Sequence, residues 1–515
     1  MKRIGITSLC LCLSIVLTAQ RKDVSDSLYY YVQERNDMNI AYANATLLSL
    51  VKPARTGIAT LALSREAGQY RHAQQAEKSH DGNFYTEGTA RLGRFNLAGS
   101  FLFNKMWEDS LSYTLRGVND DTGPYYYFAG RAGNYNRQQY LLRSIISYNL
   151  LKDKLLISTG VNYDYQWTVR TVDPRPDVSG LRVQLRPEIT WRLGQHSLGA
   201  GFMWGYGKEE NSISYSNTNY ASNQSDSSRV VFLNRGYGYI INIRPRWRRL
   251  EDYYGLSFSY AGELLQWRLQ TVFDWSHLKE RNLYNKSVTT SRIDYQPFGT
   301  WEKNTYTLYL LARHMAGITS QQLSIKGQYI RGLDEDQFDV FASNYSLRRQ
   351  HVDATWLIRR DAGKVITKEW GLQLSYDDRR QIDALAAHTV HYSFLQPGVS
   401  GTIYTDAGKG HRIRAMLSPS VRFPLQNMLT VPATQENMFT RGVVYPDYYY
   451  WSATAMITNL EAGWIMPSVP GKLKLGFSVN ARLENNLQQP EVTHNTVFKP
   501  GNNRLFMRLA LNLYL

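Results

Sequence analysis

The chain has 515 residues, a net charge of +16 and only two cysteines, Cys10 and Cys12. So few cysteines exclude a disulfide scaffold or a cysteine-based metal site, and no run of about 18 apolar residues follows the amino terminus, which excludes a helical membrane protein. The positive charge alone would favour nucleic-acid binding, but no basic helix or base-stacking motif accompanies it, so we expect no nucleic-acid partner. The 37 tyrosines and 12 tryptophans are typical of a membrane barrel.

The amino terminus predicts two segments ahead of the barrel. Residues 1–19 have a basic start and a mostly apolar run, which is typical of a cleaved secretory signal. Residues 20–56 show no strand-like alternation, and Ser25 or Asp26 is suited to cap a short helix there. We interpret this second segment either as a periplasmic lead-in or as a lumen-filling segment. The barrel is expected over 57–515.

From residue 57 onward, strand-like alternation of apolar and polar residues repeats about eighteen times. Short polar turns, such as Gly262-Glu263, alternate with longer connections, among them 213–251 and 282–297. Eight short turns and nine longer connections leave both ends of the barrel on the same side, as in single-chain outer-membrane barrels. We predict an all-β fold: a transmembrane antiparallel β-barrel of about eighteen strands, with sixteen as the alternative, short periplasmic turns and longer extracellular loops.

The final strand shows the alternation most clearly, because large aliphatic residues occupy every second position up to the carboxyl end. In a soluble sheet this exposed face would promote aggregation, whereas in a barrel it contacts lipid. The strand resembles the signal that the outer-membrane barrel assembly machinery reads. We therefore expect that machinery, outer-membrane lipid and lipopolysaccharide as partners, with the signal carried by Leu509, Leu511, Leu513 and Leu515.

The predicted inner faces of the five most regular strands carry twelve basic residues but only three acidic ones, Asp164, Glu188 and Glu484. Residues 20–56 add four carboxylates, too few to neutralise the remaining nine positive charges. Such a lumen would favour anions or anionic metal complexes, unless less regular strands or a plug supply the missing carboxylates. The bases are Arg170, Arg182, Arg186, Arg192, Arg412, Arg414, Arg422, Lys472, Lys474, Arg482, Arg504 and Arg508.

Four glycines follow one another along the inner face of a single predicted strand: Gly199, Gly201, Gly205 and Gly207. A strand position without a side chain leaves room for another segment to approach closely. The stripe therefore predicts contact with a lumen-filling segment such as 20–56. The alternative is that neighbouring tyrosines fold over these glycines and allow the barrel to curve.

Aromatic and arginine residues gather in the predicted outer connections. Such platforms bind sugars or anionic ligands, or else they form an interfacial girdle whose arginines pair with lipid phosphates. The candidate ligand-binding residues are Arg244, Arg246, Trp247, Arg248, Arg249, Tyr448, Tyr449 and Tyr450, and the triplet at 125–127 is similar.

No grouping of residues predicts catalysis. His388 and His391 are three residues apart, which places them on opposite faces of a strand, so they do not form a ligand pair. We predict no catalytic residues, no metal site and no cofactor, and we expect a non-enzymatic channel or uptake accessory of the cell outer membrane. The alternatives are a structural or ligand-binding surface protein and a hydrolase with its site at the barrel rim.

The tetrapeptide Asp173-Pro174-Arg175-Pro176 follows a tyrosine-rich strand. Together with the signal, the lead-in rich in Asn and Ala, and the closing strand, it resembles an uncharacterised family of Gram-negative outer-membrane barrels, domain of unknown function 6850. Members of that family resemble companions of TonB-dependent receptors. The resemblance implies a TonB-dependent receptor as a partner and a role in acquiring nutrients or metal complexes, and it assigns no catalytic residue.

Overall fold

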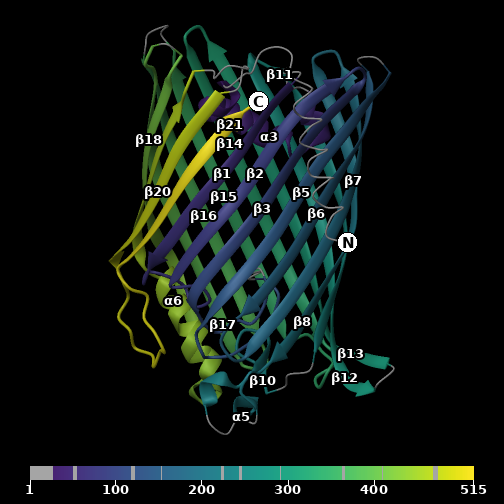
Figure 1. The fold of residues 1–515 in the computed structure, drawn as a ribbon, viewed down its shortest axis with the longest axis vertical. Helices are drawn as coiled ribbons and strands as arrows, with labels where there is room; N and C mark the ends of the chain where they lie inside the picture. Colours follow the sequence, from purple (N-terminus) through teal and green to yellow (C-terminus); the bar gives the residue numbers. More distant parts are fainter. Residues whose placement is uncertain are drawn as a thin grey trace.

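The structure, a computed structural model, describes residues 27–49, 55–117, 122–151, 154–221, 226–242, 246–289, 292–361, 366–408, 410–467 and 474–515. Within these residues eighteen strands form one closed antiparallel barrel, as predicted (Figure 1). The strands follow one another around the wall in chain order. They are β1 (Arg55–Gly68), β2 (Lys78–Leu92), β3 (Phe95–Leu111), β5 (Gly133–Leu151), β6 (Leu155–Arg170), β7 (Arg175–Leu193), β8 (His196–Ser214), β11 (Trp247–Leu264), β12 (Trp267–Thr289), β13 (Arg292–Ala316), β14 (Thr319–Asp336), β15 (Tyr345–Arg360), β16 (Ile366–Asp383), β17 (His388–Asp406), β18 (Arg412–Thr430), β19 (Thr454–Ile465), β20 (Lys474–Gln488) and β21 (Asn503–Tyr514).

The barrel closes where the last strand pairs with the first. Leu511 of β21 lies opposite Leu61 of β1, and Leu509 lies opposite Leu63. All four side chains face outward and are at least 40% exposed. Closure leaves no strand edge open, which is the condition for a sheet to exist in a bilayer.

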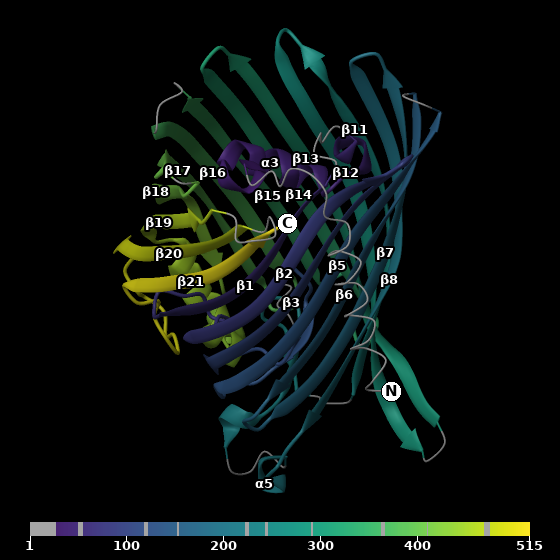
Figure 2. The same ribbon diagram turned by 45° about the horizontal axis from the view of Figure 1, so that its top comes forward.

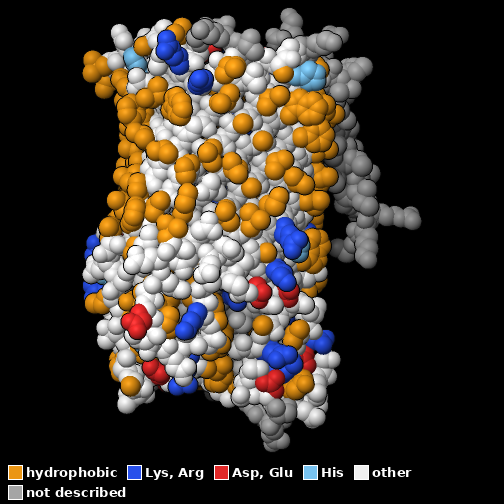
Figure 3. Space-filling model, turned by 90° about the vertical axis from the view of Figure 1, so that its left-hand side faces the viewer, with side chains coloured by type: hydrophobic (Ala, Val, Ile, Leu, Met, Phe, Trp, Pro, Cys, Tyr) orange, Lys and Arg blue, Asp and Glu red, His pale blue; other side chains and the backbone are white. Residues whose placement is uncertain are grey.

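Alternation along each strand separates an apolar outer surface from a polar inner one. On β7, Ile189 and Trp191 are 56% and 60% exposed, whereas Thr190 between them is buried inside the barrel. Figure 3 shows hydrophobic side chains spread over the wall toward the short-turn end, with the charged side chains gathered mainly toward the long-loop end. Such an apolar outer band is the feature that a membrane-spanning barrel requires.

The connections alternate between short turns and longer loops as predicted, with two local differences. The turn expected at Gly262-Glu263 is formed instead by Leu265 and Gln266, both with positive φ (51° and 67°). Within the expected loop 282–297, residues 282–289 continue β12 and residues 292–297 continue β13, and the two segments pair with each other and project beyond the barrel (Figure 2). Backbone pairing persists there beyond the barrel wall, a feature that residue composition does not reveal.

Short elements occupy the inside of the barrel near the short-turn end (Figure 2). They are the helices α2 (Ser27–Tyr30), α3 (Val32–Ala41) and α4 (Ala45–Leu48), and we call residues 27–49 the plug. The helical part is longer than the sequence predicted, and the first wall strand begins at Arg55, two residues before the predicted boundary. The predicted signal, 1–19, lies outside the described residues.

A second group of elements closes the long-loop end, where three outer connections fold inward and pack together. We call residues 112–117, 122–132, 226–242 and 431–453 the cap. Its elements are the small sheet of β4 (Tyr125–Phe128), β9 (Phe232–Arg235) and β10 (Ile240–Ile241), the single turns η1 (Ser227–Arg229) and η2 (Ala433–Gln435), and the helices η3 (Thr440–Val444) and α6 (Tyr445–Trp451). The short helix α5 (Thr218–Ala221) lies beside it in the connection after β8.

Candidate functional site

The plug is held to the wall by a charged contact at α3. Glu34 accepts hydrogen bonds from both terminal nitrogens of Arg359 at 2.6 and 2.9 Å and from Nη2 of Arg313 at 2.8 Å. Asp37, one helical turn later, pairs with Nη1 of Arg313 at 2.9 Å. Burial alone would raise the pKa of Glu34, but the hydrogen bonds and charges of Arg359 and Arg313 outweigh it and lower that pKa. The carboxylate is therefore ionised at neutral pH and binds α3 to strands β13 and β15.

A second contact holds α4 to strand β7. The carboxylate of Glu188 accepts hydrogen bonds from the backbone nitrogens of Ala45 and Thr46, at 3.4 and 3.0 Å, and from the Thr46 hydroxyl. The Thr46 hydroxyl also lies 2.7 Å from that of Thr190. A Cβ at Gly199 would collide with Oγ1 of Thr46, so this glycine provides the space in which α4 sits.

Only part of the glycine stripe serves the plug. A Cβ at Gly205 would meet Gln184, and one at Gly207 would meet Arg182 and Glu251, all of which belong to the wall. Plug contact thus accounts for Gly199, whereas close packing between adjacent strands accounts for the other positions. The tyrosine cover that the sequence also suggested is not among the nearest contacts of these glycines.

The base of the plug packs against aromatic residues near the short-turn end. Tyr30 donates a hydrogen bond to the carbonyl of Ile413 at 2.8 Å, and its ring lies 5.3 Å from that of Tyr404. Tyr30, Tyr404 and Tyr514 belong to one buried cluster that joins α2 to the wall. The plug therefore combines apolar packing at its base with charged contacts along α3 and α4.

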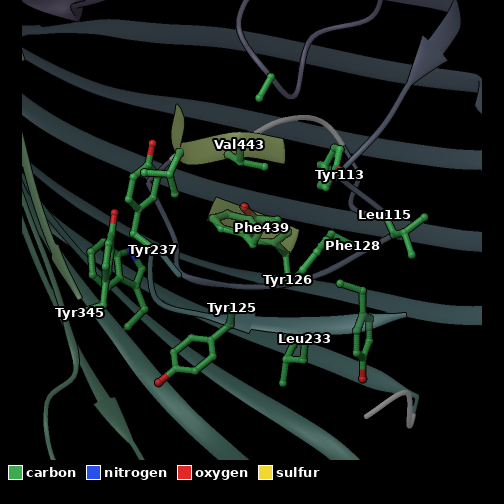
Figure 4. Close-up of a cluster of buried hydrophobic side chains, with 14 of the residues drawn as sticks. Tyr113, Leu115, Tyr125, Tyr126, Phe128, Leu233, Tyr237, Tyr345, Phe439 and Val443 are labelled. Atoms are coloured by element: carbon green, nitrogen blue, oxygen red, sulfur yellow. The ribbon is translucent and has the colours of Figure 1, made fainter. Parts of the chain in front are cut away.

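The cap and the inner side of the adjacent wall share one hydrophobic core (Figure 4). Phe439 is fully buried, with its ring centroid 5.1 Å from that of Phe128 and 6.1 Å from that of Tyr237. Trp247 and Trp301 of the wall are equally buried and belong to the same core. A cluster of this size resembles the interior of a small domain, so the three connections form one packed body.

Carboxylates at the ends of wall strands anchor the cap. Asp336, the last residue of β14, pairs with Arg235 of the cap, and both side chains are fully buried. Asp383, the last residue of β16, accepts the backbone N–H groups of Tyr237 and Tyr239 at 2.7 and 2.8 Å. Sequence reasoning missed both anchors. The available signal was an aspartate at the loop end of each strand, on the inward-facing register.

Six of the twelve predicted lumen bases have carboxylate partners, most of them on other strands, so the unpaired positive charge is smaller than the count on five strands predicted. Arg182 pairs with Glu251 at 2.7 Å, Arg186 with Asp274 at 3.1 Å and Arg504 with Glu66 at 2.6 Å. Arg412, Arg414 and Arg482 also form ion pairs. The twelve bases were counted on the five most regular strands, whereas most of the carboxylates that pair with them lie on strands outside that set.

Four of the remaining predicted bases donate hydrogen bonds to neutral acceptors. Arg170 donates to the carbonyl of Arg131 at 2.7 Å, and Arg192 donates to that of Ser49 at 3.3 Å. Arg422 donates to the carbonyl of Tyr450 at 2.8 Å, and Arg508 approaches Asn83 at 3.4 Å. Lys474 lies at the start of β20, and Lys472 lies outside the described residues.

The candidate loop-binding residues do not form one exposed platform. Trp247 and Arg249 are buried on the inner side of β11, while Arg248 between them pairs with Glu210. Tyr449 and Tyr450 are buried on α6, next to the half-buried Tyr448. The triplet 125–127 is buried in β4. Arg246 is exposed, and Arg244 lies outside the described residues. The sequence analysis expected a binding platform or an interfacial girdle, whereas these long connections fold inward and bury most of their aromatic side chains.

The tetrapeptide at 173–176 connects two neighbouring outer connections. The Asp173 carboxylate accepts the backbone N–H groups of Ser216 and Asn217 at 3.0 Å each, and Nε of Arg175 at 2.8 Å. Burial, the largest single influence, raises the pKa of Asp173, but the hydrogen bonds from Ser216, Asn217 and Arg175 together outweigh it and lower that pKa. Its role in the structure is thus to order the loops.

The histidines and helices show no other familiar site in the part of the chain that is described. His388 is buried and bound to the carbonyl of Tyr237 at 2.9 Å, whereas His391 pairs with Asp378 at 2.8 Å. Among the described residues, no group of three or more His, Cys, Asp or Glu is placed to hold a metal ion. None of the described helices is long and apolar enough to cross a membrane.

Comparison with known proteins identifies one family. The sequence profile of a family of unknown function (DUF6850) matches residues 45–515. Among curated proteins, no sequence relative was found. The resemblance predicted from the tetrapeptide, lead-in and closing strand is therefore confirmed at the level of the family.

Among solved structures, similar folds occur in several barrels. The ferric preacinetobactin receptor BauA of Acinetobacter baumannii matches with 7% identity and a TM-score of 0.37, covering 89% of this chain and 80% of that one. The FrpB iron transporter of Neisseria meningitidis (F3-3 variant) matches with 10% identity, a TM-score of 0.39 and coverage of 91% and 82%. The Escherichia coli outer membrane transporter YddB matches with 8% identity, a TM-score of 0.40 and coverage of 90% and 81%. With such low scores, the fold assignment rests on the strand pairing itself.

Proposed function

We propose that this chain, which belongs to the family of unknown function DUF6850, is a non-enzymatic outer-membrane barrel that admits a solute only when its internal closures move. The observation that carries the proposal is the pair of closures. The plug is bound inside the short-turn end through Glu34 and Glu188, and the cap is packed at the long-loop end around Phe439. A barrel closed in this way differs from a water-filled porin.

The orientation in the membrane follows from the connections and the outer surface. The short turns and the plug face the periplasm, while the cap and long loops face outward. Outer-membrane lipid and lipopolysaccharide surround the apolar band, and the assembly machinery reads the closing strand β21. This orientation places the cap on the side from which nutrients arrive and the plug on the side where they are released.

The two closures differ in what would release them. The plug is held largely by buried charge pairs and hydrogen bonds, and the cap by an aromatic core with aspartate anchors. Opening either one spontaneously would cost several kcal/mol, because buried charges would lose partners or apolar surface would be exposed. A ligand or a partner protein must therefore provide the differential binding energy. This requirement favours an uptake accessory that works with a partner, which we propose is a TonB-dependent receptor.

We propose that the lumen favours anions only at particular sites and not along its whole length. Most inward-facing arginines are neutralised by carboxylates, so a uniform positive field along the lumen is not its basis. Selectivity for an anionic solute or metal complex then depends on sites where arginines outnumber their carboxylate partners.

Planar-bilayer recordings on four proteins test the proposal. They are the wild type, Glu34→Gln to weaken the plug, Phe439→Ala to weaken the cap, and the double variant. We expect no steady current from the wild type, small or brief currents from each single variant, and sustained current from the double variant. A steady wild-type conductance would contradict the closures, and turnover of phospholipid or peptide by the wild type would contradict a non-enzymatic role.

A further inference from the structure

A cavity of about 570 Å³ lies inside the barrel between the plug and the wall. Tyr30, Arg35 and Asn39 of the plug form one side, and inward-facing residues of β1, β2 and β18–β21 form much of the other. This volume is within the usual range for small-molecule sites, which are roughly 300–1,000 Å³. Its walls are made by two bodies, the plug and the barrel.

Arginines in this cavity outnumber the carboxylates that pair with them. Arg35 of the plug and Arg414 of the wall share one carboxylate, that of Glu461. Arg482 pairs with Glu484 at 2.5 Å. A fourth arginine, Arg508, also lines the cavity. Among the described residues, two carboxylates therefore pair with three of these four guanidinium groups, and Arg508 is the fourth.

Arg508 is the unbalanced charge in this group. No carboxylate in the described chain lies within 4.0 Å of it, and its hydrogen bond to Asn83 is long, at 3.4 Å. Its Nε is buried and has no hydrogen-bond partner among the described atoms. The other acid lining the cavity, Glu87, is engaged by the hydroxyl of Tyr85. A buried N–H group without an acceptor, such as Nε–H of Arg508, costs free energy, and an anion in the cavity would supply the acceptor.

We propose that this cavity binds a small soluble anion carrying a carboxylate or phosphate group, with Arg508 as the principal donor and Arg35 and Arg414 as supporting charges. Guanidinium groups suit such oxyanions because their fixed N–H groups match two oxygens at once. Asn480 and Asn512 also line the cavity and offer neutral donors beside Arg508. The site rests on the proposed uptake function and names the class of solute that function would serve.

The position of Arg35 couples this site to the plug. Arg35 belongs to α3, so the site is complete only while the plug is docked. By thermodynamic linkage, an anion in the cavity stabilises the docked plug, and release of the plug weakens anion binding. A solute that enters past the cap would be held until the plug moves and would then be released toward the periplasm.

Calorimetric titration of the purified full-length barrel in detergent tests the site. The probes are inorganic phosphate, succinate, short-chain phosphatidylglycerol as a lipid source of the same chemistry, and spermidine as a cation. The key variant is Arg508→Gln, which breaks no ion pair in the described structure. Its control is Arg143→Gln, which makes the same charge change on the inner face of β5 outside the cavity lining.

We expect saturable binding of phosphate or succinate to the wild type, weakened about tenfold or more in Arg508→Gln, unchanged in Arg143→Gln and largely retained in Arg508→Lys. No binding of either soluble anion, equal binding in Arg508→Gln, or binding of the lipid alone would overturn the proposal. If Arg508→Gln does not fold, loss of binding in Arg482→Gln supports the site and unchanged binding overturns it. The titration measures binding and the bilayer recordings measure passage, so failure of this site is distinguishable from failure of the gating function.

Discussion

Neutralising Glu34 should release the plug. Glu34→Gln keeps the shape of the side chain but leaves Arg313 and Arg359, which are 12% and 8% exposed, with Asp37 as the nearest remaining carboxylate of the plug. Breaking a buried ion pair costs about 3–5 kcal/mol. Partial exposure of Glu34 and the remaining Asp37 contact reduce the expected cost to roughly 2–3 kcal/mol, or about 30- to 150-fold in the docking equilibrium.

The assay is the rate at which a membrane-impermeant maleimide labels a cysteine placed at Met38, which is 2% exposed in the docked plug. Residues 20–515 contain no native cysteine, so a protein produced without the predicted signal offers no competing thiol. Labelling should be faster in Glu34→Gln by the same 30- to 150-fold, because it requires undocking. The control is Glu263→Gln, at an exposed position near a short turn. Equal rates in Glu34→Gln and the control would refute the role of this contact.

Three further predictions concern the wall, the cap and pH. Leu372→Arg, on the outer face, should cost about 2–4 kcal/mol and block assembly, whereas Gln373→Arg, on the inner face, should assemble, as judged by heat-modifiable gel mobility. Phe439→Ala should destabilise the cap by about 3–5 kcal/mol and expose 431–453 to protease, unlike Phe341→Ala at a 72% exposed position. Since the pKa of Glu34 is lowered in the docked state, its stabilisation is present above about pH 4.3 and is lost as pH falls through the lower, docked value. The labelling rate at position 38, divided by that of a fully exposed cysteine at the same pH because the reactive thiolate becomes scarcer in acid, should therefore rise only in that acidic range. An equal rise in Glu34→Gln would contradict this assignment.

The barrel was predictable because its determinants are local. Outward leucines and inward polar residues alternate with a period of two, so β7 and β21 are visible in sequence without any partner strand. Turn position was less predictable, as shown by Leu265 and Gln266, which form a turn although Gly262 looked better suited to one. Adjacent strands fix the turn through pairing register, which is a long-range property.

The closures were not predictable in the same way. The ion pairs of Glu34 join residues 279 and 325 positions apart in the chain, and no spacing rule connects such residues. Likewise, the tyrosines at 125–127 were expected in a ligand-binding platform of the outer connections, but all three lie in one buried core. The balance of lumen charge also depends on which side chains meet inside the barrel, as shown by Arg182 of β7 and Glu251 of β11, which pair across the intervening strand β8. The sequence alone therefore predicts the barrel strands, whereas the contacts inside the barrel depend on the three-dimensional arrangement.

A reversible lock on the plug provides the most direct test of gating. Thr46 and Thr190 have hydroxyl oxygens 2.7 Å apart, so cysteines at both positions are placed to form a disulfide between plug and wall. In a protein that also carries Glu34→Gln and Phe439→Ala, we predict that bilayer current is low while this disulfide is intact and rises when a reductant breaks it. Equal current before and after reduction, with the disulfide verified, would contradict the claim that movement of the plug controls passage through the barrel.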